Sequence, residues 1–380
     1  MIENCKLKIV NSPLRVALVH DYLNEFGGAE RVLSVLSEIY PDAPIYTAFY
    51  KKNSTTYNHF KNRQIIPSWV HYIPFFSSKL HSPLRFLTPL IWGSFDFSKY
   101  DIVIGSASWY ITKGFKKGKN TKEICYCHTP PRWLYGFKTS VEFQKYWPVR
   151  LYAIIVGHFM RLYDFAQAQK VDVFVANSKN VAQRIKKFYR RDSVVVYPPV
   201  SLPPIPQVKK QDFYLIISRI VGAKGLDLAV KAAVKLNLKL KIVGEPTGYY
   251  TEYKQLKNIS KSNVEFLGRV SDEELVKLYA QALAFLALST DEDFGITPVE
   301  SQLAGTPVIA FRGGGYLESV IENKTGVFFD EPSVDSLISA IKKFQTINFN
   351  PSDCTTNAQK FSKDVFVKKI IKLVNSPPSQ

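Results

Sequence analysis

The sequence predicts an α/β protein of two domains, each built on a parallel β-sheet with helices between its strands. Two observations carry this prediction. Short apolar runs alternate with helical stretches along most of the chain, and five prolines crowd into residues 198–206, PPVSLPPIP, near its middle. Proline-rich backbone stays extended without regular pairing, so this segment is the predicted linker. A length of 380 residues suits two such domains, each with its own core.

The first half of the chain contains six segments that are typical of buried strands, because each is a short apolar run rich in β-branched residues. They are residues 15–20, 43–49, 101–107, 123–129, 171–177 and 193–199. The fourth of these contains Cys125 and Cys127, which are two positions apart and therefore share one face. With Cys5 and Cys354 they fit neither a metal site nor a disulfide framework, so we interpret all four as reduced structural residues.

The first predicted strand leads directly into HDYLNEFGGAE, where Gly27 and Gly28 precede a helix. The apolar residues of that helix recur at positions 32, 33, 35, 36 and 39. Glycines at this point allow the backbone to approach a phosphate or a sugar. A tight turn before a helix explains the glycine pair equally well on local evidence.

The second half restarts the alternation after the linker. Strands are predicted at 213–218, 240–244, 264–268, 284–289 and 307–311, and helices from about Leu226, over 272–282 and from near Tyr316. Between the first of these strands and its helix lie Arg219 and Lys224. Two cations beside the free N–H groups of a helix N-terminus can stabilise a departing diphosphate without a metal ion. A surface salt bridge is the alternative for either residue alone.

Two carboxylates, Glu292 and Glu300, follow the strand at 284–289 and are eight positions apart. We expect Thr297 to be the N-cap of the next helix, which puts Glu300 in its first turn. Glu292 then lies at the carboxyl end of a parallel strand, where open α/β sheets bind their ligands. Ionised carboxylates only accept hydrogen bonds, which suits the hydroxyls of a sugar or a ribose. The alternative for Glu300 is a capping box without further function.

The segment from Glu292 to Glu300, followed by LAGTPVI, resembles the E-x7-E signature of retaining GT-B glycosyltransferases of family 4. The resemblance implies a GT-B fold, in which two Rossmann-like domains face a central cleft. The implied domains are an acceptor-side domain at 1–200, a nucleotide-sugar domain at 201–360, and a C-terminal helix and tail at 361–380 that returns to the first domain. The family pattern usually has a glycine directly after the first glutamate, where this chain has Asp293.

The resemblance also implies roles for single residues. Glu292 contacts the donor sugar, Glu300 holds the ribose, and Arg219 and Lys224 stabilise the leaving diphosphate. His128, in YCHTPPRW, matches a histidine that reaches the transferred sugar from the first domain. The remaining positions implied to contact the nucleotide-sugar are Gly27, Gly28, Gly244, Val270, Phe294, Gly295, Ile296 and Thr297. Arg132, Trp133 and Tyr135 are expected to line the acceptor side, and no residue is assigned to a metal.

The glycine loop and the segment around His128 look most like bacterial mannosyltransferases that build lipid-linked surface polysaccharide from GDP-mannose. On that likeness, the expected reaction is metal-independent transfer of mannose, with retained anomeric configuration, to a glycan or polyprenyl-linked acceptor. No side chain stands out as a covalent nucleophile, so the resemblance implies a front-face displacement. A UDP-sugar donor is one alternative. A sugar-nucleotide 2-epimerase is another, against which the two glutamates and the Arg219/Lys224 pair both argue.

The net charge of +18 is concentrated in the first half of the chain. Residues 1–200 contain 28 Lys and Arg against 13 Asp and Glu, a net charge of +15, whereas residues 201–380 carry only +3. A one-sided basic surface predicts an anionic partner, either an acidic membrane leaflet or a nucleic acid. The chain contains no RRM, KH or zinc-finger pattern, so we expect a membrane surface and no nucleic acid.

Residues 69–97 are rich in aromatic side chains, and before Asp96 their only formal charges are Lys79 and Arg85. Such a segment suits a membrane interface, and packing inside the domain is the alternative. Its three prolines argue against one continuous amphipathic helix. The sequence shows no signal-peptide pattern, and its longest uncharged apolar run near the middle is too short to cross a bilayer. The expected location is therefore cytoplasmic, peripheral at the inner face of the cytoplasmic membrane.

Overall fold

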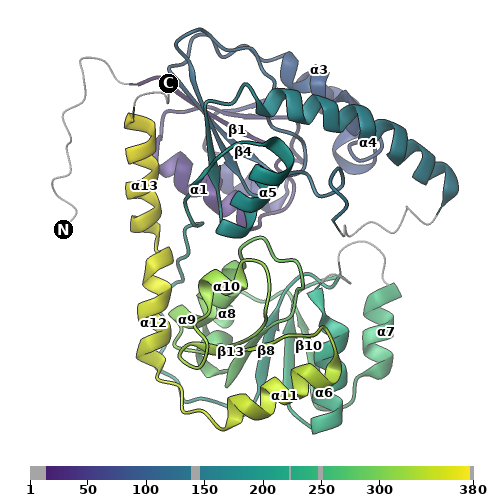
Figure 1. Ribbon diagram of the computed structural model, residues 1–380, viewed down its shortest axis with the longest axis vertical. Helices are drawn as coiled ribbons and strands as arrows, with labels where there is room; N and C mark the ends of the chain where they lie inside the picture. The colour runs from purple at the N-terminus through teal and green to yellow at the C-terminus, as the bar shows by residue number, and fades with distance from the viewer. Residues whose placement is uncertain (1–13, 138–145, 222–223, 247–250, 377–380) are drawn as a thin grey trace.

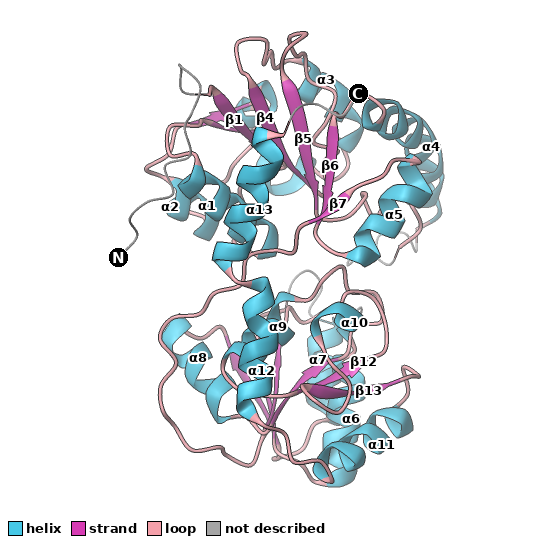
Figure 2. Ribbon diagram, turned by 60° about the vertical axis from the view of Figure 1, so that its left-hand side comes forward, coloured by secondary structure: helices cyan, strands magenta, loops and turns pink. Residues whose placement is uncertain are grey.

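A computed structural model of the chain describes residues 14–137, 146–221, 224–246 and 251–376. It contains two lobes stacked along the long axis of the molecule, and each lobe has a parallel sheet with helices on both faces (Figure 1). This is the two-domain α/β architecture that the sequence predicts. The chain connects the lobes twice, once through the proline-rich segment and once near its C-terminal end (Figure 2).

The first domain is built on a seven-stranded parallel sheet of order β3-β2-β1-β4-β5-β6-β7. Its strands are β1 (Val16–His20), β2 (Ile45–Thr47), β3 (Ile65–Pro67), β4 (Ile102–Ala107), β5 (Lys122–Cys127), β6 (Val173–Ala176) and β7 (Val194–Val195). Every residue of β1, β4 and β5 is buried, as expected for strands covered on both faces. All six predicted strands are present, and β3 is an additional edge strand that the sequence did not predict.

Helices cover both faces of this sheet. They are α1 (Gly28–Ile39), α2 (Thr55–Phe60), α3 (Thr88–Gly93), α4 (Trp147–Ala168) and α5 (Lys179–Tyr189). The helix α1 buries the predicted apolar positions Val32, Leu33, Val35 and Leu36 against β1. Its burial is what fixes the position of the preceding glycine loop relative to the sheet.

The aromatic segment 69–97 forms a series of short turns rather than one helix: η1 (Trp69–Tyr72), η2 (Phe76–Leu80), η3 (Arg85–Leu87) and then α3. Part of it packs internally, because Phe76, Trp92, Phe95 and Phe97 are buried in one core cluster. Other side chains of the segment are exposed. The exposed fraction of Tyr72, for example, is 75%. Internal packing therefore describes part of the segment, and the membrane interface stays a prediction for the exposed side chains.

The second domain is built on a six-stranded parallel sheet of order β10-β9-β8-β11-β12-β13. Its strands are β8 (Tyr214–Ile217), β9 (Leu240–Val243), β10 (Val264–Gly268), β11 (Ala284–Ala287), β12 (Val308–Phe311) and β13 (Gly326–Phe329). Its helices are α6 (Leu226–Leu236), α7 (Thr251–Ile259), α8 (Asp272–Gln281), α9 (Ile296–Leu303), α10 (Tyr316–Ser319), α11 (Val334–Gln345) and α12 (Pro351–Ala358). Two core clusters fill the two sides of the sheet.

The chain leaves the second domain through α12, the turn η6 (Gln359–Phe361) and α13 (Lys363–Asn375), which together run from the lower lobe to the upper one (Figure 2). The helix α13 packs on α1 and buries Phe366, Ile370 and Val374 in the core of the first domain. Lys122 of β5 reaches its C-terminal end, where Nζ donates to the carbonyl oxygens of Leu373 at 2.7 Å and Ser376 at 2.6 Å. A cation at a helix C-terminus is favourable, so this contact anchors the last helix.

The cysteines that the structure describes are buried and unpaired. Cys125 and Cys127 lie in β5 as predicted, and burial raises the pKa of the Cys125 thiol to about 12. A thiol that stays protonated is a poor nucleophile. The interpretation of these residues as structural therefore holds for Cys125, Cys127 and Cys354, while Cys5 lies outside the described residues.

Candidate active site

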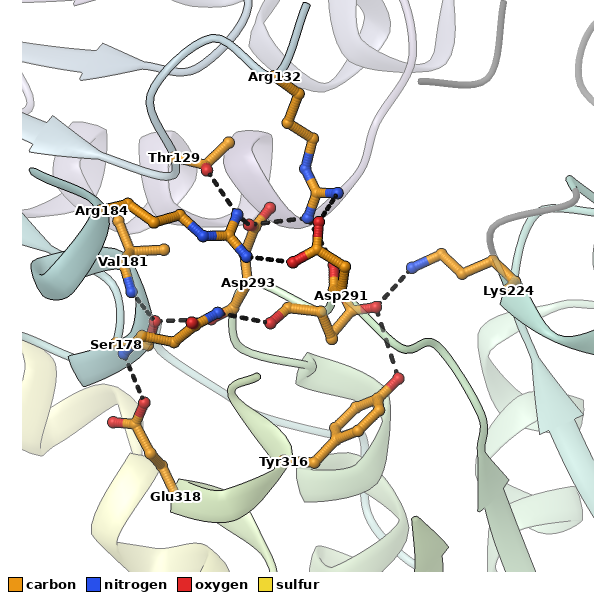
Figure 3. A network of polar contacts seen from close by, with 12 residues as sticks. Thr129, Arg132, Ser178, Val181, Arg184, Lys224, Asp291, Asp293, Tyr316 and Glu318 are labelled. Atoms are coloured by element: carbon orange, nitrogen blue, oxygen red, sulfur yellow. Dashed lines mark hydrogen bonds and ion pairs between the residues drawn. The ribbon is translucent and has the colours of Figure 1, made fainter. Parts of the chain in front are cut away.

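Glu292 lies on the loop between β11 and α9, at the carboxyl end of the second sheet. Its Oε2 atom is 2.7 Å from Nζ of Lys224, and the Tyr316 hydroxyl donates to the same oxygen at 3.4 Å (Figure 3). Lys224 follows β8, which pairs with β11, so two adjacent strand ends bring the pair together. Burial opposes ionisation of this carboxyl, but the charges of Lys224 and Arg132 outweigh it and lower the pKa of Glu292.

Glycines in the turn after β12 contact the backbone of the Glu292 loop. Gly314 has a φ of +55°, and a Cβ atom there would lie 2.3 Å from the carbonyl oxygen of Glu292. The N–H of Gly315 donates to the same oxygen at 3.0 Å, and Nδ2 of Asn180 donates to it from the first domain at 3.0 Å. The position of Glu292 is therefore fixed by both domains.

The helix that contains Glu300 begins earlier than predicted. Its first residue is Ile296 and its N-cap is Gly295, with a φ of +87°, so the expectation that Thr297 is the N-cap is wrong. The chain must turn sharply out of the Glu292 loop, and glycine adopts this left-handed conformation at little cost. The shift places Glu300 in the second turn of α9, where a capping box cannot form.

The carboxylate of Glu300 binds residues outside its own helix. It accepts a hydrogen bond from the Tyr279 hydroxyl at 2.7 Å, and its other oxygen pairs with the guanidinium of Arg31 from α1 of the first domain. The side chain of Glu300 is 1% exposed, and that of Arg31 is 35% exposed. The capping alternative for Glu300 is therefore not what the structure shows.

The glycine loop of the first domain meets the start of α9 across the domain interface. Gly27 is the N-cap of α1, and its N–H donates to Oε2 of Glu30 at 2.9 Å. A Cβ atom at Gly28 would lie 3.0 Å from Cδ1 of Ile296. The structure thus brings Gly27 and Gly28 close to the part of α9 that contains Gly295, Ile296 and Thr297.

His128 ends a chain of buried polar groups at the carboxyl end of the first sheet. Its Nε2 atom is 2.8 Å from Oγ of Ser106, which is 3.0 Å from Nδ1 of His20. The Nε2 atom of His20 is 3.3 Å from Oε1 of Glu30. Burial, reinforced by the charge of His20, lowers the pKa of His128 to about 4, so this imidazole is neutral near pH 7. The chain connects His128 to the glycine loop through Glu30.

Other residues that are predicted to contact the nucleotide-sugar lie near the carboxyl ends of β8, β9 and β10. Arg219 is exposed at the end of β8. The N–H of Gly244, after β9, donates to the carbonyl oxygen of Gly268 at 2.8 Å. Val270 follows Gly268 by two positions and is half-buried. Phe294 differs from the expectation, because its side chain is 2% exposed and packs against Tyr197 and Phe361. The side chain of Phe294 is therefore part of the protein core, and a contact of this residue with the donor stays a prediction.

An ion network that the sequence did not predict lies beside Glu292 and joins the two domains (Figure 3). Arg132 donates to Asp291 Oδ2 at 3.0 Å and to Asp293 Oδ1 at 2.8 Å. Arg184, from α5, donates to the same Asp293 oxygen at 2.6 Å and also pairs with Asp291. Asp293 stands where the resembling family usually has glycine, and this departure supplies an interdomain contact.

The N-terminus of α5 adds to this interface. Glu318, on α10 of the second domain, accepts from the backbone N–H groups of Lys179 at 2.8 Å and Asn180 at 3.0 Å. The Ser178 hydroxyl donates to the carbonyl oxygen of Asp293 at 2.6 Å. A carboxylate at a helix N-terminus is favourable both as an acceptor and through the helix dipole. The second domain therefore completes the cap of a first-domain helix.

The three residues expected on the acceptor side are engaged elsewhere. Arg132 spans the domain interface, and Nε1 of Trp133 donates to the carbonyl oxygen of Trp109 at 3.0 Å. The Tyr135 hydroxyl donates to Oδ2 of Asp164 at 2.8 Å. All three side chains make hydrogen bonds within the protein, and their expected place on the acceptor side stays a prediction.

Comparisons with known proteins agree with this geometry. Residues 26–202 match the family described as Glycosyltransferase Family 4, and residues 201–361 match the family described as Glycosyl transferases group 1. The fold is the GT-B fold of solved glycosyltransferase structures. A crystal structure of Anabaena HepE in complex with UDP and glucose aligns with a TM-score of 0.68 over 96% of this chain and 100% of that one, at 16% identity. The fold and the matches together define a glycosyltransferase.

Two further similarities extend the comparison. The chain is 26% identical over 319 residues to the alpha-1,3/1,6-mannosyltransferase ALG2 of Mus musculus, which covers 73% of each protein. The apo form of the lipopolysaccharide outer core galactosyltransferase WaaB aligns with a TM-score of 0.62 over 95% of this chain and 99% of that one, at 17% identity. The structural likenesses bear on the fold alone, whereas the ALG2 relationship extends through both domains.

Proposed function

We propose that this glycosyltransferase transfers mannose from GDP-mannose, with retention of the anomeric configuration, to a glycan or polyprenyl-linked acceptor in surface polysaccharide biosynthesis. The pairing of Lys224 with Glu292, 2.7 Å apart at the carboxyl ends of adjacent strands, is the observation that carries the proposal. It places a cation for a diphosphate and an acceptor for sugar hydroxyls in one site. The similarity to ALG2 supports mannose.

In this reaction the bond between the sugar C1 and the diphosphate breaks while the acceptor oxygen forms a bond to C1 on the same face. The acceptor proton passes to the departing phosphate oxygen. Lys224 and the exposed Arg219 supply positive charge where negative charge develops on the diphosphate, which lowers the barrier. Because two side chains supply this charge, we propose that turnover needs no divalent metal ion.

The remaining roles follow from position. Glu300 would bind the ribose hydroxyls and exchange its pairing with Arg31 for them. Glu292 would orient the sugar once Lys224 turns to the phosphate. Neutral His128 lies in the first domain at the end of a hydrogen-bonded chain, where a polar atom can reach the sugar from the other side of the interface.

A donor panel tests the proposal. GDP-mannose is expected to raise the melting temperature and to be consumed, whereas UDP-glucose and UDP-N-acetylglucosamine are not. Lys224→Ala should lower turnover by roughly a hundredfold, the effect of removing one fixed transition-state donor. Lys231→Ala, which removes an exposed surface pair on α6, is the matched control.

Two outcomes would overturn separate parts of the proposal. Consumption of a UDP-sugar alone would make the donor assignment wrong while leaving the reaction class intact. Loss of turnover in EDTA, restored by magnesium or manganese, would contradict metal independence. NMR of the product, showing the configuration at C1, decides retention.

A further inference from the structure

The helix α4 has an apolar stripe on its exposed side. The stripe consists of Trp147, Leu151, Ile154, Ile155, Phe159 and Leu162, whose exposed fractions lie between 50% and 74%. These positions recur every three or four residues and therefore lie along one face of the helix. Exposed His158 lies on the same face. Globular proteins normally place mainly polar residues on such a face, so an exposed stripe with six large apolar side chains indicates a binding surface.

Packing within the described part of the chain does not account for this stripe. The inner face of α4 is a separate set of residues, in which buried Met160 packs with Ile111 and Leu134 and half-buried Val156 and Tyr163 border them. On the same inner side, Asp164 pairs with Lys113 at 2.9 Å, and both are buried. The helix is therefore apolar on two sides, and only one of them faces the protein.

The neighbouring aromatic segment extends the apolar surface. Figures 1 and 2 show α3 beside α4 on the outer side of the first domain, and the Tyr152 hydroxyl of α4 donates to the carbonyl oxygen of Pro83. Exposed apolar side chains of this segment are Trp69, Tyr72, Phe75, Phe86 and Leu90, with exposed fractions between 42% and 75%. Aromatic residues of this kind favour the boundary between water and lipid.

Charge decides which partner fits this surface. Residues 69–95 and 146–163 contain no Asp or Glu, and their formal charges are Lys79, Arg85, Arg150 and Arg161. The first half of the chain carries +15. A second copy of this chain would bring the same positive charge to the contact, whereas an anionic bilayer complements it.

We infer that the α4 stripe and the neighbouring segment lie on the surface of an anionic lipid bilayer, with α4 parallel to it. Within the described residues no helix is both long and apolar enough to cross a membrane. An amphipathic helix lying in the interface buries its apolar face among the headgroups, while basic residues attract acidic lipids. The inference does not depend on the donor proposed above.

The bilayer surface would also lie near the candidate active site. Trp133 and Leu134 border the inner face of α4, and Arg132, directly before them, binds the aspartates on either side of Glu292. A lipid-linked acceptor held in the bilayer would therefore approach the site from this side of the first domain.

Vesicle flotation tests the inference with the whole chain. The wild-type protein is expected to float with vesicles of phosphatidylcholine and phosphatidylglycerol, more weakly at high salt, and to stay at the bottom with phosphatidylcholine alone. Leu151→Gln/Ile155→Gln/Phe159→Gln should lower the partition coefficient at least about tenfold, because three apolar side chains no longer enter the lipid. Ile205→Gln/Ile259→Gln changes two comparably exposed apolar residues outside the stripe and should bind like the wild type.

A second readout reports insertion directly. Brominated lipid should quench tryptophan fluorescence of the wild type, and Trp147→Phe should remove a large part of that quenching. Equal flotation of the triple variant and the wild type would overturn the inference, as would failure of the wild type to bind anionic vesicles. A wild-type dimer that the triple variant converts to a monomer, without vesicle binding, would show that the stripe is a contact between copies. A cooperative melting transition without ligand confirms that each variant is folded, and a separate thermal shift with GDP tests the proposed donor independently of these outcomes.

Discussion

Glu300 already has two partners in this structure, and a ribose bound as proposed would have to compete with one of them. Its hydrogen bond with Tyr279 is buried, whereas Arg31 is 35% exposed and belongs to the other domain. Exchange of the exposed ion pair for ribose hydroxyls is therefore easier than loss of the buried hydrogen bond. This assigns Tyr279 the task of orienting the carboxylate.

The two glutamates are expected to affect different steps. Glu300→Gln should weaken binding of GDP about tenfold to a hundredfold, the cost of hydrogen bonds to a charged group. Glu292→Gln should bind GDP normally but lower turnover, because the proposed role of Glu292 is to contact the sugar rather than the nucleotide. Calorimetry with GDP and initial rates with GDP-mannose measure the two effects. Normal GDP affinity in Glu300→Gln, with only a lower melting temperature, would contradict the role in ribose binding.

His128 is expected to make the protein sensitive to acid. Burial lowers its pKa to about 4 in the folded state, whereas an unfolded histidine titrates near pH 6.5. The unfolded chain therefore binds a proton first, and the stability that His128 contributes is complete above pH 6.5 and lost progressively as the pH falls toward 4.

The histidine's contribution is measurable by substitution. Between about pH 6.5 and pH 4.5, the free energy of unfolding should fall less in His128→Gln than in the wild type. The difference should be on the order of 2 kcal/mol. Urea unfolding at several pH values provides the comparison. Free energies of unfolding that differ by the same amount at every pH would contradict the lowered pKa.

Among the structural elements, the turn after β12 controls the site most directly. Gly314 has a positive φ, and a Cβ atom added there would approach the Glu292 carbonyl oxygen to 2.3 Å, so Gly314→Ala must move the Glu292 loop. Gly136 also has a positive φ, of +77°, but nothing lies within 4 Å of its Cβ position. Gly136→Ala therefore carries only the cost of the left-handed conformation, about 1–2 kcal/mol.

We expect Gly314→Ala to lose turnover by more than tenfold, because a displacement of about 1 Å at a catalytic site has effects of this size. Gly136→Ala should lower the melting temperature without this loss of turnover. Initial rates at a temperature where both variants are folded separate strain from displacement. Equal turnover in the two variants would show that the loop tolerates the shift.

Most elements were predictable because local sequence determines them. The strand at 101–107 begins with the β-branched apolar run at 102–104, which is enough to predict the buried strand β4. The strands β3 and β13 were missed because IIP and GVFF are short and contain proline or glycine, residues that disfavour strands. The start of α9 was misplaced because Thr297 and Pro298 form a good local N-terminus, while packing of Gly295 against Tyr316 starts the helix earlier.

The candidate site was predictable only within each domain. Lys224 and Glu292 meet because β8 and β11 are neighbours in one sheet, which the order of strands already indicates. The contacts of Arg31 with Glu300 and of Arg184 with Asp293 depend on how two separately folded domains are placed. No periodicity or motif in the sequence contains that information. The aspartate after Glu292 is visible in the sequence as a departure from the family pattern. The residues with which it pairs cannot be read from the sequence.

At the scale of the whole molecule, polar contacts hold the domains together around the candidate site. Asp293 is the centre of these contacts, since its Oδ1 atom accepts from Arg132 at 2.8 Å and from Arg184 at 2.6 Å. Both guanidinium groups come from the first domain, and the carboxylate comes from the second. If the proposed site is correct, nucleotide-sugar enters and product leaves between these domains, and the strength of this contact would then set how often they separate.

Asp293→Asn should therefore shift the molecule toward an open arrangement. An amide keeps the shape of the side chain but not its charge, and loss of charge-assisted hydrogen bonds costs about 1.5–3 kcal/mol, or about tenfold to a hundredfold in the ratio of closed to open forms. Small-angle scattering should show a larger radius of gyration in the variant, and the apparent affinity for GDP-mannose should fall with the closed fraction. Asp335→Asn removes an exposed pair with Lys235 on the surface of the second domain and should change neither quantity. An unchanged radius of gyration with normal donor affinity in Asp293→Asn would mean that the other interdomain contacts suffice to hold the domains closed.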